Sequence, residues 1–185
     1  IIPTAIEFVD IAGLVKGASS GEGLGNQFLS HIRNVDAIVH IVRGFENSDI
    51  THVEGSIDTV RDIQIIETEL LLKDLETLNK RKDKIAKIAK SGDKDSIKEL
   101  KLLDIVIEEL DNGNFLFSYD GNASETSIIN SWSLLSNKPM FYLCNVDEQD
   151  LEKNDNSYFL KLQEYANQKN VTCIKLCGSI EMEIS

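Results

Sequence analysis

Residues 8–26 read FVDIAGLVKGASSGEGLGN, in which an apolar run ends in a carboxylate and is followed by a glycine-studded loop. The apolar side chains of Ile6, Phe8 and Val9 predict a buried strand over residues 5–10 that delivers Asp10 at its end. A carboxylate in that position can hold magnesium through a water molecule, and Gly13 lets a backbone N–H approach a terminal phosphate. The pattern therefore predicts phosphate chemistry.

The loop after this strand carries four further glycines: Gly17, Gly21, Gly23 and Gly25. Such a segment loses much conformational entropy on ordering, which is typical of a loop that changes shape or lets a ligand come close. An ordinary flexible surface loop is one alternative. A dinucleotide fingerprint over residues 21–25 is another, but its glycines come about ten residues too late after the strand to seat a pyrophosphate.

Composition limits the protein class. A chain of 185 residues with 42% hydrophobic content can bury one sizeable core, and we expect one domain with an insertion. The longest apolar runs are strand-sized, and no signal peptide or membrane span is expected. The three cysteines lack a metal-ligand spacing and fit a reducing, cytoplasmic setting. A net charge of −12 disfavours generic nucleic-acid binding, so any such contact should be local.

Three more strands are predicted further along the chain, at residues 36–45, 139–144 and 172–177. The first of these reads DAIVHIVRGF and is apolar on both faces, as in a central parallel strand covered by helices. Short helices are expected at residues 27–33 and 158–168. Strands alternating with helices predict an α/β fold with a mostly parallel sheet.

Residues 58–136 contain no strand pattern. Apolar side chains recur there at helical spacing on both sides of the break Ser91-Gly92-Asp93, which predicts two long helices in an antiparallel, coiled-coil hairpin. A third helix is expected at residues 126–135. We therefore expect a nucleotide-binding domain made of residues 1–57 and 137–185, interrupted by a helical insertion at 58–136.

The first hairpin helix is basic near its tip, on an otherwise acidic chain. One interpretation is a solvated face paired with acids on the return helix. The other is a local contact with RNA phosphates or an acidic partner. The basic residues are Lys80, Arg81, Lys82, Lys84, Lys87 and Lys90.

The sequence FYLCNVDE at residues 141–148 stands where a nucleotide hydrolase of this kind reads its base. Guanine-specific proteins carry Asn-Lys-x-Asp there, whereas this chain has Val146 at the lysine position and Glu148 at the aspartate position. An acceptor placed one methylene further out misses the guanine geometry, which favours adenine. In the alternative interpretation, Asn145 only caps the turn after the strand.

Together these motifs resemble the Obg-like ATPases, or YchF family, of P-loop hydrolases. The resemblance rests on residues 7–15, 21–26, 43–47 and 145–148, which read EFVDIAGLV, GEGLGN, RGFEN and NVDE. It implies a Ras-like P-loop nucleotide hydrolase core, incomplete here, with an inserted helical hairpin. It also implies use of ATP and Mg²⁺ with GTP weaker, and a cytoplasmic protein that associates with ribosomes.

The resemblance also implies roles for individual residues. Asp10 would hold the magnesium and Gly13 would contact the γ-phosphate. Leu14 replaces the glutamine that orients the attacking water in many GTPases, and the family implies His52 as the catalytic residue instead. The residues alone leave open that the His52 imidazole simply lies in solvent.

The same resemblance implies two loops around the base. Asn145, Val146 and Glu148 would form the first of these. The last nucleotide loop of the family, whose backbone lies behind the base, matches Cys177, Gly178 and Ser179.

The chain lacks a Gly-x-x-x-x-Gly-Lys-Ser/Thr loop, and it also lacks the small C-terminal TGS domain of the family. Without that phosphate loop we expect this chain alone to bind ATP weakly and not to hydrolyse it. Uncovered sheet edges should favour self-association. The alternative function is a non-catalytic binding module whose helical hairpin docks on a ribosomal or protein partner.

Overall fold

The computed structural model describes residues 5–11, 29, 31–47, 55–153 and 155–184. Its centre is a three-stranded sheet, with β1 (Ile38–Arg43), β2 (Met140–Asn145) and β3 (Thr172–Leu176) in that spatial order. Both strand pairs are parallel, and the register places Val42 beside Cys144 and Cys144 beside Lys175. The predicted α/β class with a parallel sheet is confirmed. All three strands end at the same edge of the sheet.

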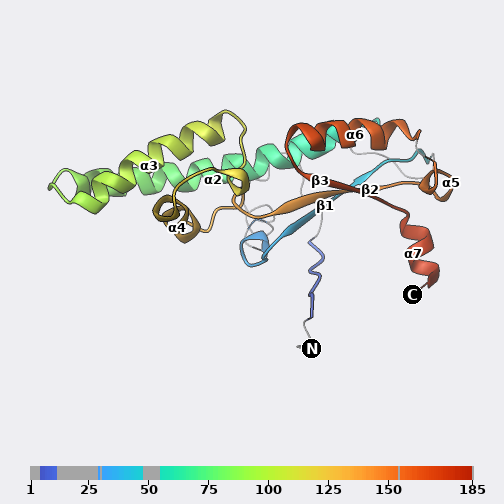
Figure 1. Ribbon diagram of the computed structural model, residues 1–185, viewed down its shortest axis with the longest axis horizontal. Helices are drawn as coiled ribbons and strands as arrows, with labels where there is room; N and C mark the ends of the chain where they lie inside the picture. The colour runs from blue at the N-terminus through green and yellow to red at the C-terminus, as the bar shows by residue number, and fades with distance from the viewer. Residues whose placement is uncertain (1–4, 12–28, 30, 48–54, 154, 185) are drawn as a thin grey trace.

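Two helices lie over one face of this sheet (Figure 1). Helix α6 (Ser157–Gln168) joins β2 to β3, as parallel pairing requires. Helix α2 (Thr59–Ala89) packs beside α6 and β1. Leu162 and Ala166 of α6 are fully buried, so this helix turns one apolar side toward the strands.

The predicted helical hairpin is also confirmed. Helix α2 runs for 31 residues to the tip, and α3 (Lys94–Asp111) returns antiparallel to it. The turn between them contains Gly92 with φ +86°, a conformation that only glycine adopts without strain. The Asp93 carboxylate then accepts the Ser96 N–H at 2.8 Å and begins the return helix.

The chain crosses from the hairpin back to the sheet through η1 (Leu116–Ser118) and α4 (Ala123–Ser131). The third helix of the hairpin region therefore exists, but the predicted bounds of 126–135 were wrong. Asn122 and Glu125 form a reciprocal cap that begins the helix earlier. It ends before Ser133, whose φ of +53° is incompatible with a continuing helix.

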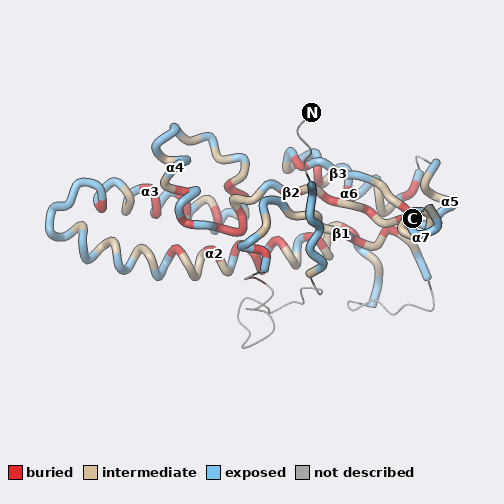
Figure 2. Tube along the Cα trace, turned by 90° about the horizontal axis from the view of Figure 1, so that it is seen from below, coloured by how far each residue is buried: buried red, intermediate tan, exposed pale blue. Residues whose placement is uncertain are grey.

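One continuous core extends from the hairpin into the sheet. Figure 2 shows buried residues along the facing sides of α2 and α3 and along the strands. The largest fully buried side chains include Leu70, Leu78, Leu103 and Leu110 in the hairpin, and Tyr142 and Leu162 in the sheet layer. Because this core is continuous, the hairpin packs onto the sheet over its inner half.

Two further sequence predictions are wrong in the described part of the chain. Residues 5–10 form no strand, and Ile6 and Phe8 are each 81% exposed. An apolar run becomes a strand only where another backbone pairs with it, and the described residues supply none. The second error concerns β1, which was expected to be covered on both faces: Ile41 is 61% exposed, since α2 and α6 cover only the opposite face.

Two short helices were not predicted. Helix α5 (Glu148–Leu151) follows β2, where the Asp147 carboxylate accepts the Glu148 N–H at 2.9 Å. Helix α7 (Gly178–Ile184) follows β3. Among the described helices, none combines the length and the apolar character that crossing a bilayer requires.

Candidate functional site

The ends of β2 and β3 are joined by a side chain. Asn145 Oδ1 accepts a hydrogen bond from the backbone N–H of Gly178 at 3.0 Å, and the Val146 N–H donates to the Leu176 carbonyl at 2.8 Å. In open α/β sheets, ligands bind outside the carboxyl ends of the strands. These residues therefore form a corner, residues 145–148 with 177–179, at the expected edge.

The other end of the Asn145 amide is available to a ligand. Within the described residues, Nδ2 donates to no protein acceptor, and the side chain is only partly buried. A fixed amide with a free N–H can donate to a ring nitrogen of a purine base. The tie to Gly178 holds the amide in one orientation, so the free donor has a defined direction.

Gly44, directly after β1, brings a third segment to this corner. Its N–H donates to the Asn145 carbonyl at 2.7 Å. A Cβ at this position would lie 2.4 Å from Cys144 Sγ and 3.3 Å from the Asn145 carbonyl oxygen, so no larger residue fits without a shift. Burial raises the pKa of the Cys144 thiol to about 12, which keeps it protonated.

The loop after Gly44 is ordered by Arg43. Its guanidinium lies 4.9 Å from the centre of the Phe45 ring and donates to the carbonyls of Phe45 (2.9 Å) and Asn47 (3.0 Å). Glu46 accepts the Tyr158 hydroxyl at 2.7 Å, and this hydrogen bond raises the pKa of Tyr158. In the sequence, residues 43–47 contributed to the resemblance but carried no predicted role.

Asn156 also organises this corner and was not predicted from the sequence. Its Nδ2 donates to the Gly44 carbonyl at 3.1 Å and to Asp150 at 2.9 Å, while its Oδ1 caps α6 by accepting the Phe159 N–H at 2.8 Å. The side chain is buried. One amide thus connects the loop after β1, helix α5 after β2 and the start of α6. Its only sequence signal is an asparagine before a helix, which is too common to mark a site.

The structure brings the residues predicted to surround the base together at this corner, but they differ in how far they are buried. Val146 is only 2% exposed, so its side chain lies in the core and not on an open surface. Glu148 is exposed at the start of α5. Cys177 is buried with Sγ 3.1 Å from Ser179 Oγ, and Gly178 lies against Asn145.

Of the predicted phosphate and metal residues, only Asp10 lies in the described part of the chain. Asp10 is exposed in a segment without regular structure. Gly13 and His52 lie outside the described residues. Across the described ranges, no three His, Cys, Asp or Glu side chains gather in a way that would hold a metal ion.

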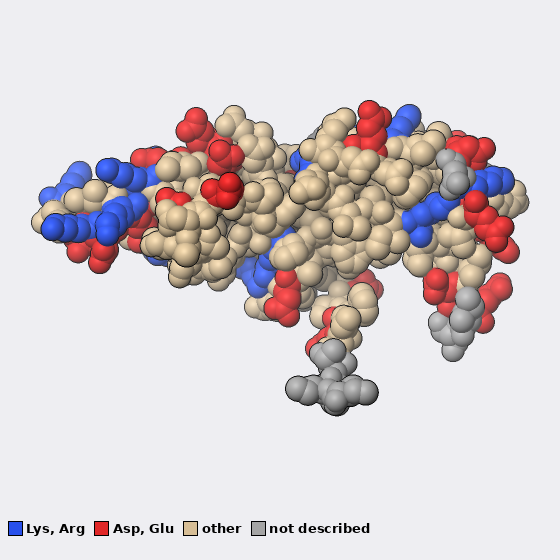
Figure 3. Space-filling model, viewed as in Figure 1, with Lys and Arg blue, Asp and Glu red and all other residues tan. Residues whose placement is uncertain are grey.

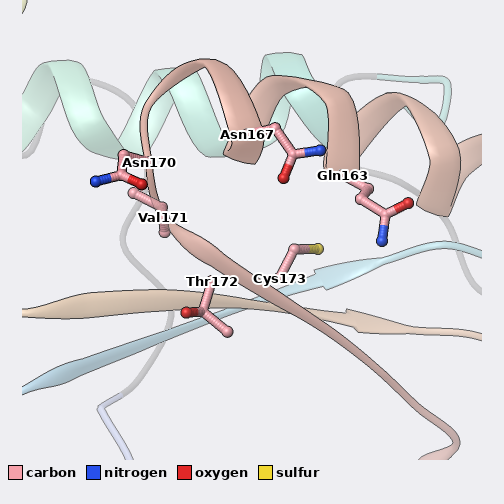
Figure 4. A pocket seen from close by; sticks show the side chains of 6 residues that line it. All are labelled: Gln163, Asn167, Asn170, Val171, Thr172 and Cys173. Atoms are coloured by element: carbon pink, nitrogen blue, oxygen red, sulfur yellow. The ribbon is translucent and has the colours of Figure 1, made fainter.

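Two hollows lie away from this corner. A hollow of about 340 Å³ lies between α6 and the first residues of β3, where Gln163 and Asn167 reach toward Cys173 (Figure 4). It is at the opposite end of β3 from Cys177. A second hollow, of about 470 Å³, lies between residues 113–120 and the end of α6. Neither contains a predicted site residue.

The parallel α/β fold places this corner at the sheet edge where ligands bind in open sheets, and comparison with known proteins identifies the family. The family model described as "50S ribosome-binding GTPase" matches residues 2–97. The chain therefore belongs to that family of P-loop proteins.

Within the family, the chain is similar to the YchF and Obg-like ATPases. It is 44% identical to the ribosome-binding ATPase YchF of Bacillus subtilis, over all of this chain and 50% of the relative. It is 41% identical to Obg-like ATPase 1 of Saccharomyces cerevisiae, over 98% of this chain and 48% of the relative. The chain thus spans about half the length of the curated relatives it matches.

A solved structure agrees with this. The YchF GTPase of Schizosaccharomyces pombe superimposes with a TM-score of 0.77 at 39% identity, over 90% of this chain and 46% of that chain. The expected Ras-like P-loop fold with a helical insertion is therefore confirmed.

Proposed function

We propose that this chain is the base-binding and hairpin-bearing part of a hydrolase that uses ATP in preference to GTP and associates with ribosomes. The observation that carries the proposal is the Asn145 amide, whose Oδ1 is held by Gly178 and whose Nδ2 has no acceptor in the described residues. The names of the relatives, "Ribosome-binding ATPase YchF" and "Obg-like ATPase 1", support the ATPase activity and the ribosome association.

In this proposal residues 1–57 and 137–185 form the nucleotide-binding part, and residues 58–136 the hairpin part. Asp10 would hold Mg²⁺ through water, and Gly13 would offer its backbone N–H to the γ-phosphate. His52 would orient the attacking water, because Leu14 cannot. Association with ribosomes would place the protein in the cytoplasm.

The ATP preference is proposed to come from Glu148. The free Asn145 N–H can serve adenine and guanine alike, since both purines carry the N7 acceptor. Discrimination must then come from the residue facing the other ring edge, and Glu148 is exposed at the start of α5. Because the Val146 side chain is buried, Val146 would contribute to the ATP preference through its backbone, or because it provides no lysine at this position.

The test is nucleotide titration of the protein at its natural length, with Mg²⁺ present. Wild type should bind ATP more tightly than GTP, and the double variant Val146→Lys/Glu148→Asp should shift the preference toward GTP by about tenfold or more. The matched control is Glu152→Asp, a change of the same kind just beyond α5. Unchanged selectivity in the double variant would show that the base is read elsewhere.

Catalysis is tested separately at His52. Exchange of His52 for Ala should lower kcat by about a hundredfold and leave ATP affinity nearly unchanged, as expected for a group that acts on the attacking water. Equal turnover would remove His52 from the mechanism. The isolated 185-residue chain should show no micromolar ATP binding by calorimetry, because the phosphate loop contributes the strongest contacts.

The hairpin tip is proposed to contact the ribosome. Figure 3 shows Lys and Arg side chains gathered at the distal end of the hairpin. Arg81 pairs with Glu99 at 2.5 Å and Lys82 with Asp104 at 2.7 Å. Within the described part of the chain, the exposed Lys84, Lys87 and Lys90 pair with no carboxylate. Unpaired cations on an acidic protein favour a local contact with phosphates.

If the tip contacts the ribosome, reversing a charge there should weaken ribosome binding. Lys87→Glu should weaken co-sedimentation with ribosomes and reduce its dependence on salt concentration. Lys161→Glu is the matched control, because it makes the same charge change at an exposed position on α6. Equal binding by both variants would remove the tip from the interface. Ribosome binding without any ATP turnover would favour the non-catalytic binding module.

A further inference from the structure

Glu67, on the buried side of α2, is a carboxylate enclosed by the protein. It is 3% exposed and accepts three hydrogen bonds. The donors are the hydroxyl of Tyr142, the hydroxyl of Tyr165 at 2.6 Å and the ammonium of Lys169 at 2.9 Å. The lysine is itself placed between two rings, 5.4 Å from the centre of Phe115 and 5.2 Å from that of Tyr165. A buried carboxylate is stable only when its oxygens are satisfied in this way.

The three donors belong to the segments that carry the nucleotide corner. Tyr142 lies in β2, three residues before Asn145. Tyr165 and Lys169 lie at the end of α6, directly before β3, which leads to Gly178. Asn145 and Gly178 therefore join the ends of β2 and β3, while the Glu67 carboxylate of α2 joins β2 to the end of α6, from which the chain leads into β3.

From Glu67, helix α2 continues without a break to the hairpin tip. Seven residues further on, the buried Asp74 accepts the N–H groups of Leu135 at 3.0 Å and Ser136 at 2.7 Å. Nearer the start of the helix, the Thr59 hydroxyl donates to the Tyr158 carbonyl at 2.9 Å. Of these hydrogen bonds from Thr59, Glu67 and Asp74 along α2, only the one to Glu67 from Tyr142 reaches strand β2.

We propose that Glu67 is a positioning residue that couples the helical hairpin to the nucleotide corner. A displacement of the hairpin would move the Glu67 carboxylate, and with it Tyr142 and Lys169. Strand β2, which ends in Asn145, and the end of α6, which leads through β3 to Gly178, would then shift together. The inference depends on the proposed function only in that the corner binds ATP.

Coupling between two sites is reciprocal, so ATP binding at the corner should change the stability of the hairpin. The experiment is hydrogen exchange on the protein at its natural length, with and without saturating Mg-ATP. In wild type, ATP should slow exchange of backbone amides in α3 and the outer half of α2 by about fivefold or more. This readout requires no ribosome.

Two variants test the role of Glu67. Glu67→Gln keeps one acceptor oxygen, replaces the other with an NH₂ group and loses the charge that pairs with Lys169, whereas Tyr142→Phe removes only the hydrogen bond to β2. Both should bind ATP within about threefold of wild type, while the ATP-dependent change in hairpin exchange falls below about twofold. If Glu67→Gln does not fold, Tyr142→Phe alone decides the outcome.

The matched control is Glu99→Gln. Glu99 pairs with Arg81 and accepts the Trp132 indole N–H at 3.2 Å, entirely within the helical region. This variant should loosen the hairpin but keep its response to ATP. If ATP does not bind wild type, the proposed function and the coupling fall together. If ATP binds but hairpin exchange does not respond, or responds equally in wild type and both Glu67-contact variants, only the coupling is overturned.

Discussion

The Asn145 side chain and the Gly178 backbone share a hydrogen bond of 3.0 Å that replaces strand pairing beyond the last residues of β2 and β3. Because it uses Oδ1, the bond orients the amide so that Nδ2 remains available. A single side chain therefore has two separable roles, one in holding the corner and one in binding a ligand.

The two roles of Asn145 can be separated by substitution. Asn145→Asp keeps an acceptor for the Gly178 N–H but loses the donor, so stability should stay near wild type while ATP affinity falls about tenfold or more. Asn145→Ala should lose both, with about 1 kcal/mol of unfolding free energy as well. Urea unfolding and ATP titration measure the two effects. Wild-type ATP affinity in Asn145→Asp would show that Nδ2 binds no ligand.

Gly44→Ala should destabilise the protein by roughly 1 to 3 kcal/mol, because the added methyl group would lie 2.4 Å from Cys144 Sγ. Shortening the opposing side chain should relieve this clash, so the double variant Gly44→Ala/Cys144→Ala should recover at least half of the loss. Gly178→Ala is the control, since its nearest neighbour would lie at an ordinary 3.5 Å. Additive losses in the double variant, measured by urea unfolding, would contradict the argument.

Asp74→Asn should cost roughly 2 to 4 kcal/mol of unfolding free energy. The buried carboxylate accepts hydrogen bonds from Leu135 N–H, Ser136 N–H and the Ser136 hydroxyl. In asparagine an NH₂ group replaces one of the two carboxylate oxygens, so a donor would face these donors. Burial raises the pKa of Asp74, and the hydrogen bonds from Ser136 and Leu135 oppose that shift. Asp104→Asn, which affects only an exposed pair with Lys82, should cost less than about 1 kcal/mol.

His40 should make stability depend on pH. Burial lowers the pKa of His40 from 6.5 to about 4, although Glu67 and Asp62 act in the opposite direction. Between these values the unfolded state binds more protons, so stability is complete above pH 6.5 and falls as the pH drops toward 4. The loss should be roughly 1 to 3 kcal/mol.

The measurement for His40 is urea unfolding of wild type and His40→Gln from pH 4 to 7. Carboxylates also titrate in this range, but they are common to both proteins, so the difference between the two curves isolates the imidazole. Parallel curves would mean that His40 titrates in the folded protein as it does in the unfolded chain.

Much of the fold could be predicted because its signals are periodic. The apolar spacing in residues 63–88 and 97–110 indicated the hairpin, and Gly92 marked its turn. The runs at residues 36–45, 139–144 and 172–177 indicated the sheet. The strand expected at residues 5–10 failed because an apolar run carries no information about whether a second backbone lies beside it.

The polar residues that organise the structure were harder to find. Glu67 and Asp74 lie on the same side of α2 as Ile63, Leu70 and Leu78, where a carboxylate looks like an interruption of the apolar pattern. In hindsight, two acids seven residues apart on a buried helix face are a signal, because each must find donors elsewhere in the chain. Asn156 gave no such signal, because an asparagine before a helix is common, and neither did Arg43, whose hydrogen bonds are to backbone carbonyls.

Helix α2 runs unbroken for 31 residues from the sheet to the turn. Each residue added to or removed from a straight helix rotates everything beyond it by roughly 100°. A single-residue insertion between Glu67 and Lys84 would therefore turn the basic tip to another side of the molecule while leaving the sheet unchanged. Among related proteins, insertions and deletions in this helix should therefore come in steps of about seven or eleven residues, because such steps return the tip to nearly the same side of the molecule.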